Sequence, residues 1–331
     1  MAATAGLRSR IKGTGRSLPE HVLTNQDLEK IVDTSDEWIR TRTGIRERRV
    51  ASKDECLSTF ASEAGRRALE MAGMESMDLD LIILATVTMD QPIPATACFV
   101  QDLLGAKRAA AMDMAAGCSG FIYALSVADQ FIRMGTYRNI LVIGGEVLSK
   151  FLDWNDRATC VLFGDGAGAV VLTAEENGQG LLSTAIHADG AMADFITLPG
   201  GGSRHPVTHE MIDQNLHTIK MKGNETFKIA VRSLEAVCRE ALDKAGLKPT
   251  DVRWFVPHQA NTRIIGAVAD RLGWPPETLY LNIDRIGNTS SASIPIALDE
   301  MVRAGQVKEN DVLLFAAFGA GLTWGSALVR W

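Results

Sequence analysis

The sequence has little of what marks disordered, disulfide-bonded or nucleic-acid-binding proteins. Its 331 residues contain five cysteines, an odd number without a Cys-x-x-Cys pair, which argues against a disulfide framework or a zinc site and for a reducing compartment. Charged residues make up 22% and hydrophobic residues 46%, which excludes disordered and collagen-like chains. Because 34 Lys and Arg stand against 40 Asp and Glu, we expect no nucleic-acid partner.

Long apolar segments are also missing. The first residues, MAATAGLRSRIKGTGRSLPEH, have no apolar core of signal-peptide length. Residues 312–329 are uncharged, but Gly319, Gly321 and Gly325 interrupt them, which predicts two buried strands joined by a glycine turn rather than a membrane span. We therefore expect a cytoplasmic protein without a membrane partner.

Apolar strand-like runs alternate with amphipathic helix-like stretches along the chain. This alternation predicts an α/β protein whose strands are buried on both faces. At about 150 residues per domain, the length predicts two domains. The predicted strands are 79–88, 140–143, 159–163, 169–173, 254–256 and 312–316. The predicted helices are 57–72, 119–134, 225–244 and 262–272.

Similar phrases recur in the same order in the two halves of the chain. GCSGFIYALSVADQFIRMG is answered by GNTSSASIPIALDEMVRAG, FGDGAGAVVL by FGAGLTWGSALV, and DLDLIILATVT by DVRWFVPHQAN. This repetition predicts a duplicated fold, with an N-terminal half of residues 1–177 and a C-terminal half of residues 178–331. Packing of the halves about a pseudo-twofold axis would bring Cys118 and Asn288 together, each at the N-terminus of a helix.

Cys118 is the cysteine whose surroundings favour chemistry. It follows the strand-like segment 110–114 and precedes an apolar helix, and small residues surround it. A thiol at a helix N-terminus experiences the positive end of the helix dipole, which predicts a lowered pKa. The alternative for Cys118 is a packed core cysteine. The other four cysteines lie within helix-like or strand-like runs, which indicates packing: Cys56, Cys98, Cys160 and Cys238.

His258 and Asn288 are the candidates to act with this thiol. His258 lies just after a predicted strand, where it would carry a proton or donate a hydrogen bond; the alternative is a structural histidine. Asn288 is either the N-cap of the following helix or an amide donor to a developing oxyanion. A papain-like protease also uses Cys, His and Asn, but its local cysteine signature near the chain start is absent here. Acyl transfer through a thiol remains.

Glycine, arginine and histidine clusters offer further candidate sites. The glycine-rich turn 164–168 precedes a strand rather than a helix, which argues against dinucleotide binding. Arginines between residues 40 and 49 are either solvated or, beside Trp38, suited to a ligand with phosphates and an adenine ring. No standard metal-ligand spacing relates the histidines of the 200–219 loop, so we expect no metal: His205, His209 and His217.

Together, several segments resemble one known family. DEWI with TRTGI, the phrase around Cys118, FGDGAGA, HQAN, GNTSSAS and TWGSALVR are similar to motifs of β-ketoacyl-acyl-carrier-protein synthase III, over nearly the whole chain. The resemblance implies a duplicated thiolase-like fold with five layers, α-β-α-β-α, in a homodimer. It implies an acyltransferase that condenses an acyl-CoA primer with malonyl-acyl carrier protein, with decarboxylation, to start fatty acid synthesis. It implies no metal or redox cofactor, and it makes acyl-CoA a substrate rather than a cofactor.

The resemblance also assigns roles to particular residues. Cys118 would take the acyl group, with an oxyanion hole from its own N–H and that of Ala320. His258 and Asn288 would bind the malonyl thioester carbonyl and stabilise the enolate. The predicted CoA-binding residues are Trp38, Arg42 and Arg157. The predicted carrier-protein contacts are Lys228, Gln259, Ala260, Asn261, Thr262 and Arg263.

The sequence departs from the family pattern at three positions. Ala320 replaces a frequent glycine, and Asp270 stands where a basic carrier-docking residue can occur. Ile93 occupies the position where some members place a phenylalanine from the dimer partner that closes the acyl pocket. A smaller side chain there would deepen the pocket, so the primer can be longer than acetyl-CoA. Two alternatives to the initiating enzyme are a relative in secondary metabolism that uses another acyl-CoA, and a non-catalytic partner subunit.

Overall fold

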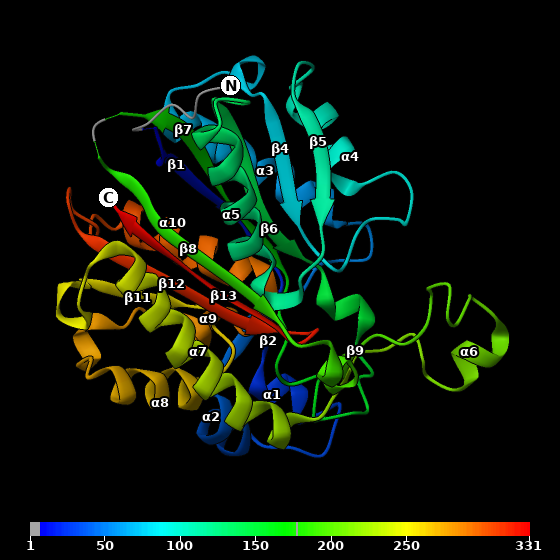
Figure 1. The fold of residues 1–331 in the computed structure, drawn as a ribbon. Helices are drawn as coiled ribbons and strands as arrows, with labels where there is room; N and C mark the ends of the chain where they lie inside the picture. The colour runs from blue at the N-terminus through cyan, green and yellow to red at the C-terminus, as the bar shows by residue number, and fades with distance from the viewer. Residues whose placement is uncertain (1–6, 177) are drawn as a thin grey trace.

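Two mixed β-sheets form the centre of the computed structural model, which describes residues 7–176 and 178–331 (Figure 1). The first sheet has the order β1-β7-β6-β4-β5. In it, β4 is parallel to β5 and β6, while β7 is antiparallel to β6 and β1. Its strands are β1 (Arg8–Ser17), β4 (Leu81–Ala85), β5 (Ala110–Met114), β6 (Asn139–Glu146) and β7 (Gly166–Glu175).

The second sheet repeats this pattern in the order β11-β12-β13-β8. Here β11 is parallel to β12, and β13 is antiparallel to β12 and β8. At the edge equivalent to β5, Leu279 forms a single parallel bridge with Phe255. The strands are β8 (Gly180–Ala188), β11 (Trp254–Pro257), β12 (Val312–Gly319) and β13 (Thr323–Arg330). The duplication expected from the sequence is therefore present in the strand order.

Helices fill three layers around these sheets. Between the sheets lie α5 (Gly120–Arg133) and α10 (Ser293–Arg303), in an apolar core that takes side chains from both sheets. Outside the first sheet lie α3 (Leu57–Ala72) and α4 (Thr96–Leu104), and outside the second lie α7 (Gly223–Ala245) and α8 (Thr262–Leu272). The resulting α-β-α-β-α arrangement agrees with the predicted fold.

The layering explains why the strands are continuously apolar. In β4, Leu81 and Ile83 face the central helices, whereas Ile82 and Leu84 face α3. Successive strand residues point to opposite faces, so a strand covered on both sides needs an apolar residue at every position. All five residues of β4 are buried.

Shorter elements surround the open end of the two sheets. The segment between β8 and α7 contains β9, α6 and β10, and α6 extends away from the body of the molecule (Figure 1). Besides short 3-10 turns, the remaining α-helices and strands of the described residues are α1 (Asn25–Leu28), α2 (Asp36–Thr43), α9 (Ile283–Ile286), β2 (Val22–Thr24), β3 (Glu47–Arg49), β9 (Ile196–Thr197), α6 (His209–Asp213) and β10 (Lys220–Met221).

One predicted strand is wrong. Residues 159–163 form turns, in which the backbone N–H of Cys160 bonds to Asp156 and that of Leu162 to Thr159. Only Phe163 makes a strand-like bridge, to Asn288. The apolar residues here pack in a small core beside α2 and not in a sheet. The prediction failed because apolar composition indicates burial but not the presence of a neighbouring strand.

The uncharged segment 312–329 forms β12 and β13, as predicted. Within the described part of the chain, no helix has the length and apolarity needed to span a bilayer. The division into halves at residues 177 and 178 stays a prediction, and residue 177 lies outside the described residues. The first sheet takes its strands from residues 8–175 and the second from residues 180–330.

Candidate active site

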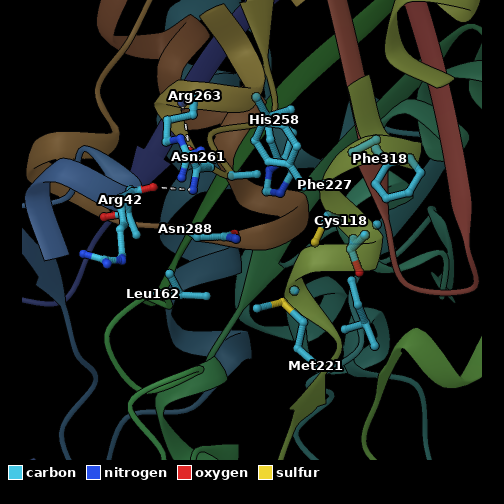
Figure 2. Close-up of a pocket in the computed structure, with 18 of the residues that line it drawn as sticks. Arg42, Cys118, Leu162, Met221, Phe227, His258, Asn261, Arg263, Asn288 and Phe318 are labelled. Atoms are coloured by element: carbon cyan, nitrogen blue, oxygen red, sulfur yellow. Dashed lines mark hydrogen bonds between the residues drawn. The ribbon is translucent and has the colours of Figure 1, made fainter. Parts of the chain in front are cut away.

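One cavity of about 580 Å³ brings together residues from both halves of the chain. Cys118 approaches it from the turn before α5, His258 from the end of β11, and Asn288 from the segment before α10 (Figure 2). Leu162, Met221, Phe227 and Phe318 supply apolar walls. The cavity is therefore suited to an apolar group held beside a thiol and two nitrogen-bearing side chains.

The Cys118 backbone is packed directly against the turn between β12 and β13. A Cβ atom on Gly319 would lie 2.6 Å from the backbone nitrogen of Cys118, and one on Gly117 would lie 2.9 Å from that of Ala320. Gly117 also has a φ of 51°, a conformation that favours glycine. These two glycines allow the backbone N–H groups of Cys118 and Ala320 to come close to the thiol.

Thr323 is hydrogen-bonded to both the turn that contains Cys118 and the turn between β12 and β13. Its Oγ1 lies 2.8 Å from the carbonyl oxygens of Ala116 and Ala320, and 2.5 Å from Oγ of Ser119. One hydroxyl thus links the chain on both sides of Cys118 to the β12–β13 turn. The position of the two backbone donors is consequently fixed by packing between the halves.

The expectation of a lowered thiol pKa is wrong for the protein as it stands. Cys118 lies in a 3-10 turn, Gly117–Ser119, and burial raises the pKa of its thiol to about 11. A hydrogen bond with Ser290 acts in the opposite direction, and the carboxylate of Glu146 raises the pKa further. Desolvation of the thiolate therefore outweighs its stabilisation by the helix terminus.

His258 is a buried, neutral imidazole held at one nitrogen. It is 5% exposed, and burial lowers its pKa to about 3. Its Nδ1 lies 2.7 Å from Oγ of Ser293, and that hydroxyl lies 2.9 Å from the carbonyl oxygen of Ser290. Ser293 thus fixes the plane of the ring and leaves Nε2 as the nitrogen available to a ligand in the cavity.

The amide of Asn288 is oriented by its oxygen. Oδ1 accepts a hydrogen bond of 2.9 Å from the backbone N–H of Ser290, which closes a local turn. Its Nδ2 is the group left to donate, and the residue lines the cavity with only 7% of its surface exposed. The N-cap of the following 3-10 turn is Thr289 and that of α10 is Ala292, so the prediction that Asn288 caps the following helix is wrong.

Aromatic and cationic side chains form another wall of the same cavity. The guanidinium carbons of Arg42 and Arg157 lie 4.5 Å and 4.9 Å from the centroid of the Trp38 indole ring. Arg157 also donates a hydrogen bond of 2.9 Å to the carbonyl oxygen of Asp33. All three predicted CoA-binding residues line the cavity, where a flat aromatic ring and two cations suit a nucleotide.

The arginine cluster near Trp38 is not one site. Arg48 is fully buried and donates to Oδ1 of Asn25 and to the carbonyl oxygens of Leu23 and Val161. Its burial lowers the pKa of the guanidinium to about 10. Arg48 therefore holds β3 to the neighbouring segments, and Arg42 is the cluster member that lines the cavity.

The predicted carrier-protein contacts separate into exposed and buried residues. Lys228 and Arg263 are exposed, and both line the cavity together with Ala260 and Asn261. Asn261 caps α8 by accepting from the N–H of Arg263, and its Nδ2 donates to the carbonyl oxygen of Arg42 (Figure 2). Thr262 is half-buried and makes a hydrogen bond of 3.3 Å to the carbonyl oxygen of Thr43.

Gln259 is a correction to this set. It is 1% exposed, and its side-chain N–H group donates to the carbonyl oxygens of Pro257 and Tyr280. Its Oε1 accepts from the backbone N–H of Asn282. The side chain is thus used to join β11 to the segment before α9, and it has no surface left for a partner protein.

Comparison with known proteins identifies the family. The model of the 3-oxoacyl-[acyl-carrier-protein] synthase III family matches residues 112–190, and the model of its C-terminal part matches residues 242–331. The chain is 54% identical over 321 residues to "Beta-ketoacyl-[acyl-carrier-protein] synthase III" of Caldanaerobacter subterraneus subsp. tengcongensis, covering 97% of both chains.

Solved structures give the same result. The crystal structure of 3-oxoacyl-[acyl-carrier-protein] synthase III from Aquifex aeolicus is 52% identical and has a TM-score of 0.90, with 98% of this chain and 100% of that chain covered. The synthase III from Thermus thermophilus is 46% identical with a TM-score of 0.91, covering 98% and 99%. This chain belongs to the β-ketoacyl-acyl-carrier-protein synthase III family.

Membership confirms the predicted thiolase-like fold and the prediction of an acyl-transferring condensing enzyme. It also favours the initiating condensing enzyme over a relative of secondary metabolism. Among the described residues, no group of three or more His, Cys, Asp or Glu side chains is arranged to hold a metal.

Ile93 lies outside this synthase III cavity. It is 84% exposed in the single chain, between β4 and α4. That Ile93 closes the acyl pocket of a partner subunit stays a prediction. The sequence interpretation also missed Ser290 and Ser293, which hold Asn288 and His258, although both lie in the recognised GNTSSAS segment.

Proposed function

We propose that this chain condenses an acyl-CoA primer with malonyl-acyl carrier protein and releases CO2 and 3-oxoacyl-acyl carrier protein. The observation that carries the proposal is that Cys118, His258 and Asn288 line a single cavity with Trp38 and Arg157. A thiol that accepts an acyl group, two nitrogen donors and a nucleotide platform are the parts that this reaction requires.

In the first half-reaction, the sulfur of Cys118 attacks the thioester carbonyl of acyl-CoA. The backbone N–H groups of Cys118 and Ala320 stabilise the resulting oxyanion, and CoA leaves as its thiolate. Support for this pair comes from the close packing of Gly319 on the backbone nitrogen of Cys118 and of Gly117 on that of Ala320.

In the second half-reaction, His258 and Asn288 hold the malonyl thioester carbonyl. Loss of CO2 leaves an electron pair on the adjacent carbon, and Nδ2 of Asn288 and Nε2 of His258 stabilise the enolate oxygen. With the Ser293 hydroxyl donating to Nδ1 of His258, the neutral imidazole carries its proton on Nε2, and this N–H donates a hydrogen bond to that oxygen. The carbanion then attacks the acyl-Cys118 carbonyl, and the cysteine thiolate leaves.

Substrate recognition divides between two sets of residues. Trp38, Arg42 and Arg157 bind the nucleotide end of CoA by stacking and charge. Lys228 and Arg263, both exposed at the cavity, attract the acidic carrier protein, with Ala260, Asn261 and Thr262 beside them. The reaction draws its carbanion from CO2 loss and therefore needs no metal or redox cofactor.

Primer length, assembly and location complete the proposal. The enzyme is a cytoplasmic homodimer in which Ile93 of one subunit closes the acyl pocket of the other. Because isoleucine is smaller than phenylalanine, we expect the pocket to admit acetyl-CoA and somewhat longer acyl-CoAs. Acylation rates across a series of acyl-CoA chain lengths, with Ile93→Phe as the comparison, test this; a rejection of all but acetyl-CoA by both proteins contradicts it.

The central experiment is mass spectrometry of the protein after incubation with acetyl-CoA. We expect one acetyl group, on Cys118, in the wild type and none in Cys118→Ala. Addition of malonyl-acyl carrier protein should then remove the acetyl group and release CO2. A wild-type protein that neither takes up an acyl group nor releases CO2 would be a non-catalytic subunit, and the proposal would fail.

A further inference from the structure

A fully buried carboxylate lies behind Cys118 and has no role in the reaction described above. Glu146 ends β6, is 0% exposed, and makes hydrogen bonds to residues of both halves of the molecule. Burying a carboxylate is costly unless it is fully hydrogen-bonded, so the partners of its two oxygen atoms are informative.

One of these oxygens is saturated with donors. Oε2 accepts from the backbone N–H of Val87 and the hydroxyl of Thr86, both at 3.1 Å, and from the hydroxyl of Thr88 at 2.6 Å. Each of these hydroxyls itself accepts a backbone N–H, that of Thr88 or that of Val147. Their protons are therefore directed at Glu146, and Oε2 has no place for a proton of its own.

The other oxygen is differently placed. Oε1 lies 3.3 Å from the hydroxyl of Ser290 and 3.1 Å from that of Ser291. The Ser291 hydroxyl has a second acceptor, the carbonyl oxygen of Ala85, at 2.9 Å. When the Ser291 hydroxyl donates to the carbonyl oxygen of Ala85, its hydrogen no longer points at Oε1. Oε1 can then carry a proton of its own without a clash between two hydrogens. The protonation site of Glu146 is thus the oxygen that faces Ser290.

Ser290 connects this oxygen to the nucleophile. The turn Gly117–Ser119 packs against the turn Ser290–Ala292, and the side chain of Ser290 lowers the pKa of the Cys118 thiol. Its hydroxyl also lies 3.3 Å from Oε1 of Glu146. The residue has a φ of 49°, an unfavourable conformation for a serine, and the surrounding packing holds it there. Its N–H is bound by Asn288 and its carbonyl by Ser293, so the hydroxyl alone remains free to relay a proton.

We propose that Glu146 accepts the proton of the Cys118 thiol through the hydroxyl of Ser290. This inference rests on the proposed acyl transfer to Cys118. As the sulfur attacks the acyl-CoA carbonyl, the S–H bond breaks and its proton passes to Oγ of Ser290. The original Ser290 proton passes to Oε1 of Glu146, and CoA leaves as a thiolate that takes its proton from solvent.

The same proton then balances the second half-reaction. The electron pair released by CO2 loss forms the new carbon–carbon bond and finally resides on the sulfur of Cys118, which leaves as a thiolate. Glu146 returns its proton through Ser290, which restores the thiol and the carboxylate. During the acyl-enzyme stage the buried site therefore holds a neutral thioester and a neutral carboxyl group, and no unpaired charge.

The surroundings of Glu146 are compatible with this exchange. Burial raises its pKa to about 7, so the group can both accept and release a proton near neutral pH. The other titratable groups close to it are Cys118, whose pKa it raises, and Asp165, beside its strand partner Gly166. The carboxylate of Asp165 is occupied by the N–H of Ala51 and by Ser149.

The test compares the pH dependence of Cys118 reactivity in wild type and Glu146→Gln. The side chain of Gln has the same shape, and its amide oxygen can accept the three hydrogen bonds that Oε2 accepts. The amide cannot take up a proton. We expect acylation by acetyl-CoA at pH 7 to fall about 10-fold to 100-fold, and its rate to keep rising with pH where the wild type has levelled off. If the carboxylate acted only by repulsion, its removal would lower the thiol pKa and make the variant equally fast or faster, which would overturn the proposal.

Two serine variants complete the design. Ser290→Ala interrupts the relay but keeps Glu146, and should reproduce the pH profile of Glu146→Gln; it also carries the test if that variant does not fold. Ser291→Ala removes a contact with the same oxygen but none with Cys118, and should stay within about twofold of wild type. A Ser290→Ala profile equal to that of the wild type would contradict the relay.

Alkylation by iodoacetamide separates this inference from the proposed function. It reports deprotonation of the Cys118 thiol without acyl-CoA. A shifted alkylation profile in Glu146→Gln, together with a wild type that acetyl-CoA does not acylate, would support the proton acceptor and contradict the acyl-transfer function. Normal acylation of the wild type together with identical alkylation profiles would support the acyl-transfer function and contradict the proton acceptor.

Discussion

Ser293 Oγ lies 2.7 Å from Nδ1 of His258 and is the side-chain partner that orients the imidazole. Ser293→Ala removes this contact, so the ring loses both its fixed plane and the group that determines which nitrogen carries the proton. We expect decarboxylation of malonyl-acyl carrier protein to fall about 10-fold, while acylation of Cys118 stays within about twofold. Release of labelled CO2 and mass spectrometry of the acyl-enzyme measure the two steps separately.

Ser326→Ala is the matched control for this variant. Ser326 is also a buried serine that donates one hydrogen bond to a backbone carbonyl, that of Val237, but it lies in β13 and does not line the cavity. Each substitution should cost about 1 kcal/mol of stability. Equal loss of decarboxylation in both variants would show that the effect of Ser293 is one of stability and not of orientation.

Gly319→Ala should disrupt acyl transfer through the backbone. The new Cβ would lie 2.6 Å from the nitrogen and 2.8 Å from Cβ of Cys118, so the β12–β13 turn has to move away. We expect a loss of about 1–3 kcal/mol in the free energy of unfolding, typical of overpacking, and at least about a 10-fold slower acylation. Urea unfolding and acylation by acetyl-CoA are the measurements.

Gly266→Ala provides the comparison. It lies inside α8, where an added Cβ meets open space, so the substitution should raise stability by up to about 1 kcal/mol and leave acylation unchanged. Acylation by Gly319→Ala at the wild-type rate would mean that the oxyanion hole does not depend on this close approach.

Arg157→Ala should weaken the binding of CoA but not the chemistry. The guanidinium carbon lies 4.9 Å from the Trp38 ring centroid, and its removal takes away one cation beside the nucleotide platform. We expect KM for acetyl-CoA to rise about 3-fold to 10-fold with kcat nearly unchanged. A truncated thioester without the nucleotide should react equally with both proteins.

Arg253→Ala is the matched control, because Arg253 stacks on Trp254 at 4.2 Å and does not line the cavity. Its steady-state constants for acetyl-CoA should equal those of the wild type. If Arg157→Ala also lost activity with the truncated thioester, the residue would act on the reacting groups and its assignment to the nucleotide would be wrong.

His258 should make the protein less stable in acid. Its folded-state pKa of about 3 lies below the ordinary histidine value of about 6.5, so the unfolded chain binds more protons between these values. The free energy of unfolding therefore falls as pH drops below about 6.5, by up to about 1.4 kcal/mol per pH unit from this group. Glu146, with a pKa raised to about 7, acts in the opposite direction between about 7 and 4.5.

The variant His258→Gln isolates the histidine contribution. As the pH falls from 6.5 to 5, the free energy of unfolding of this variant should rise relative to that of the wild type. Urea unfolding at each pH measures the difference. Parallel stability curves would show that His258 titrates similarly in the folded and unfolded chains. The variant Glu146→Gln should show the opposite change of relative stability with pH, which provides an internal check.

Local signals were sufficient for much of the architecture. The helices at 57–72 and 262–272 were predicted with their observed bounds, because their apolar spacing and their ends lie within the segment itself. The turns at 159–163 were mistaken for a strand, because apolar composition reports burial and does not say which element is the neighbour. The resemblance assigned Gln259 a carrier-protein contact, and its motif does not show that the side chain is buried against Tyr280 and Asn282.

The sequence by itself determined the family, the duplicated layers and the identity of Cys118, His258 and Asn288 as the residues to examine, since repeats and motifs are properties of the chain order. Only the tertiary structure decided how those groups are held. The pKa of the Cys118 thiol depends on burial, on Ser290 of the other half and on Glu146, which is 28 residues away in the chain. Desolvation and hydrogen bonding act through space, so they exist only once both halves have packed together.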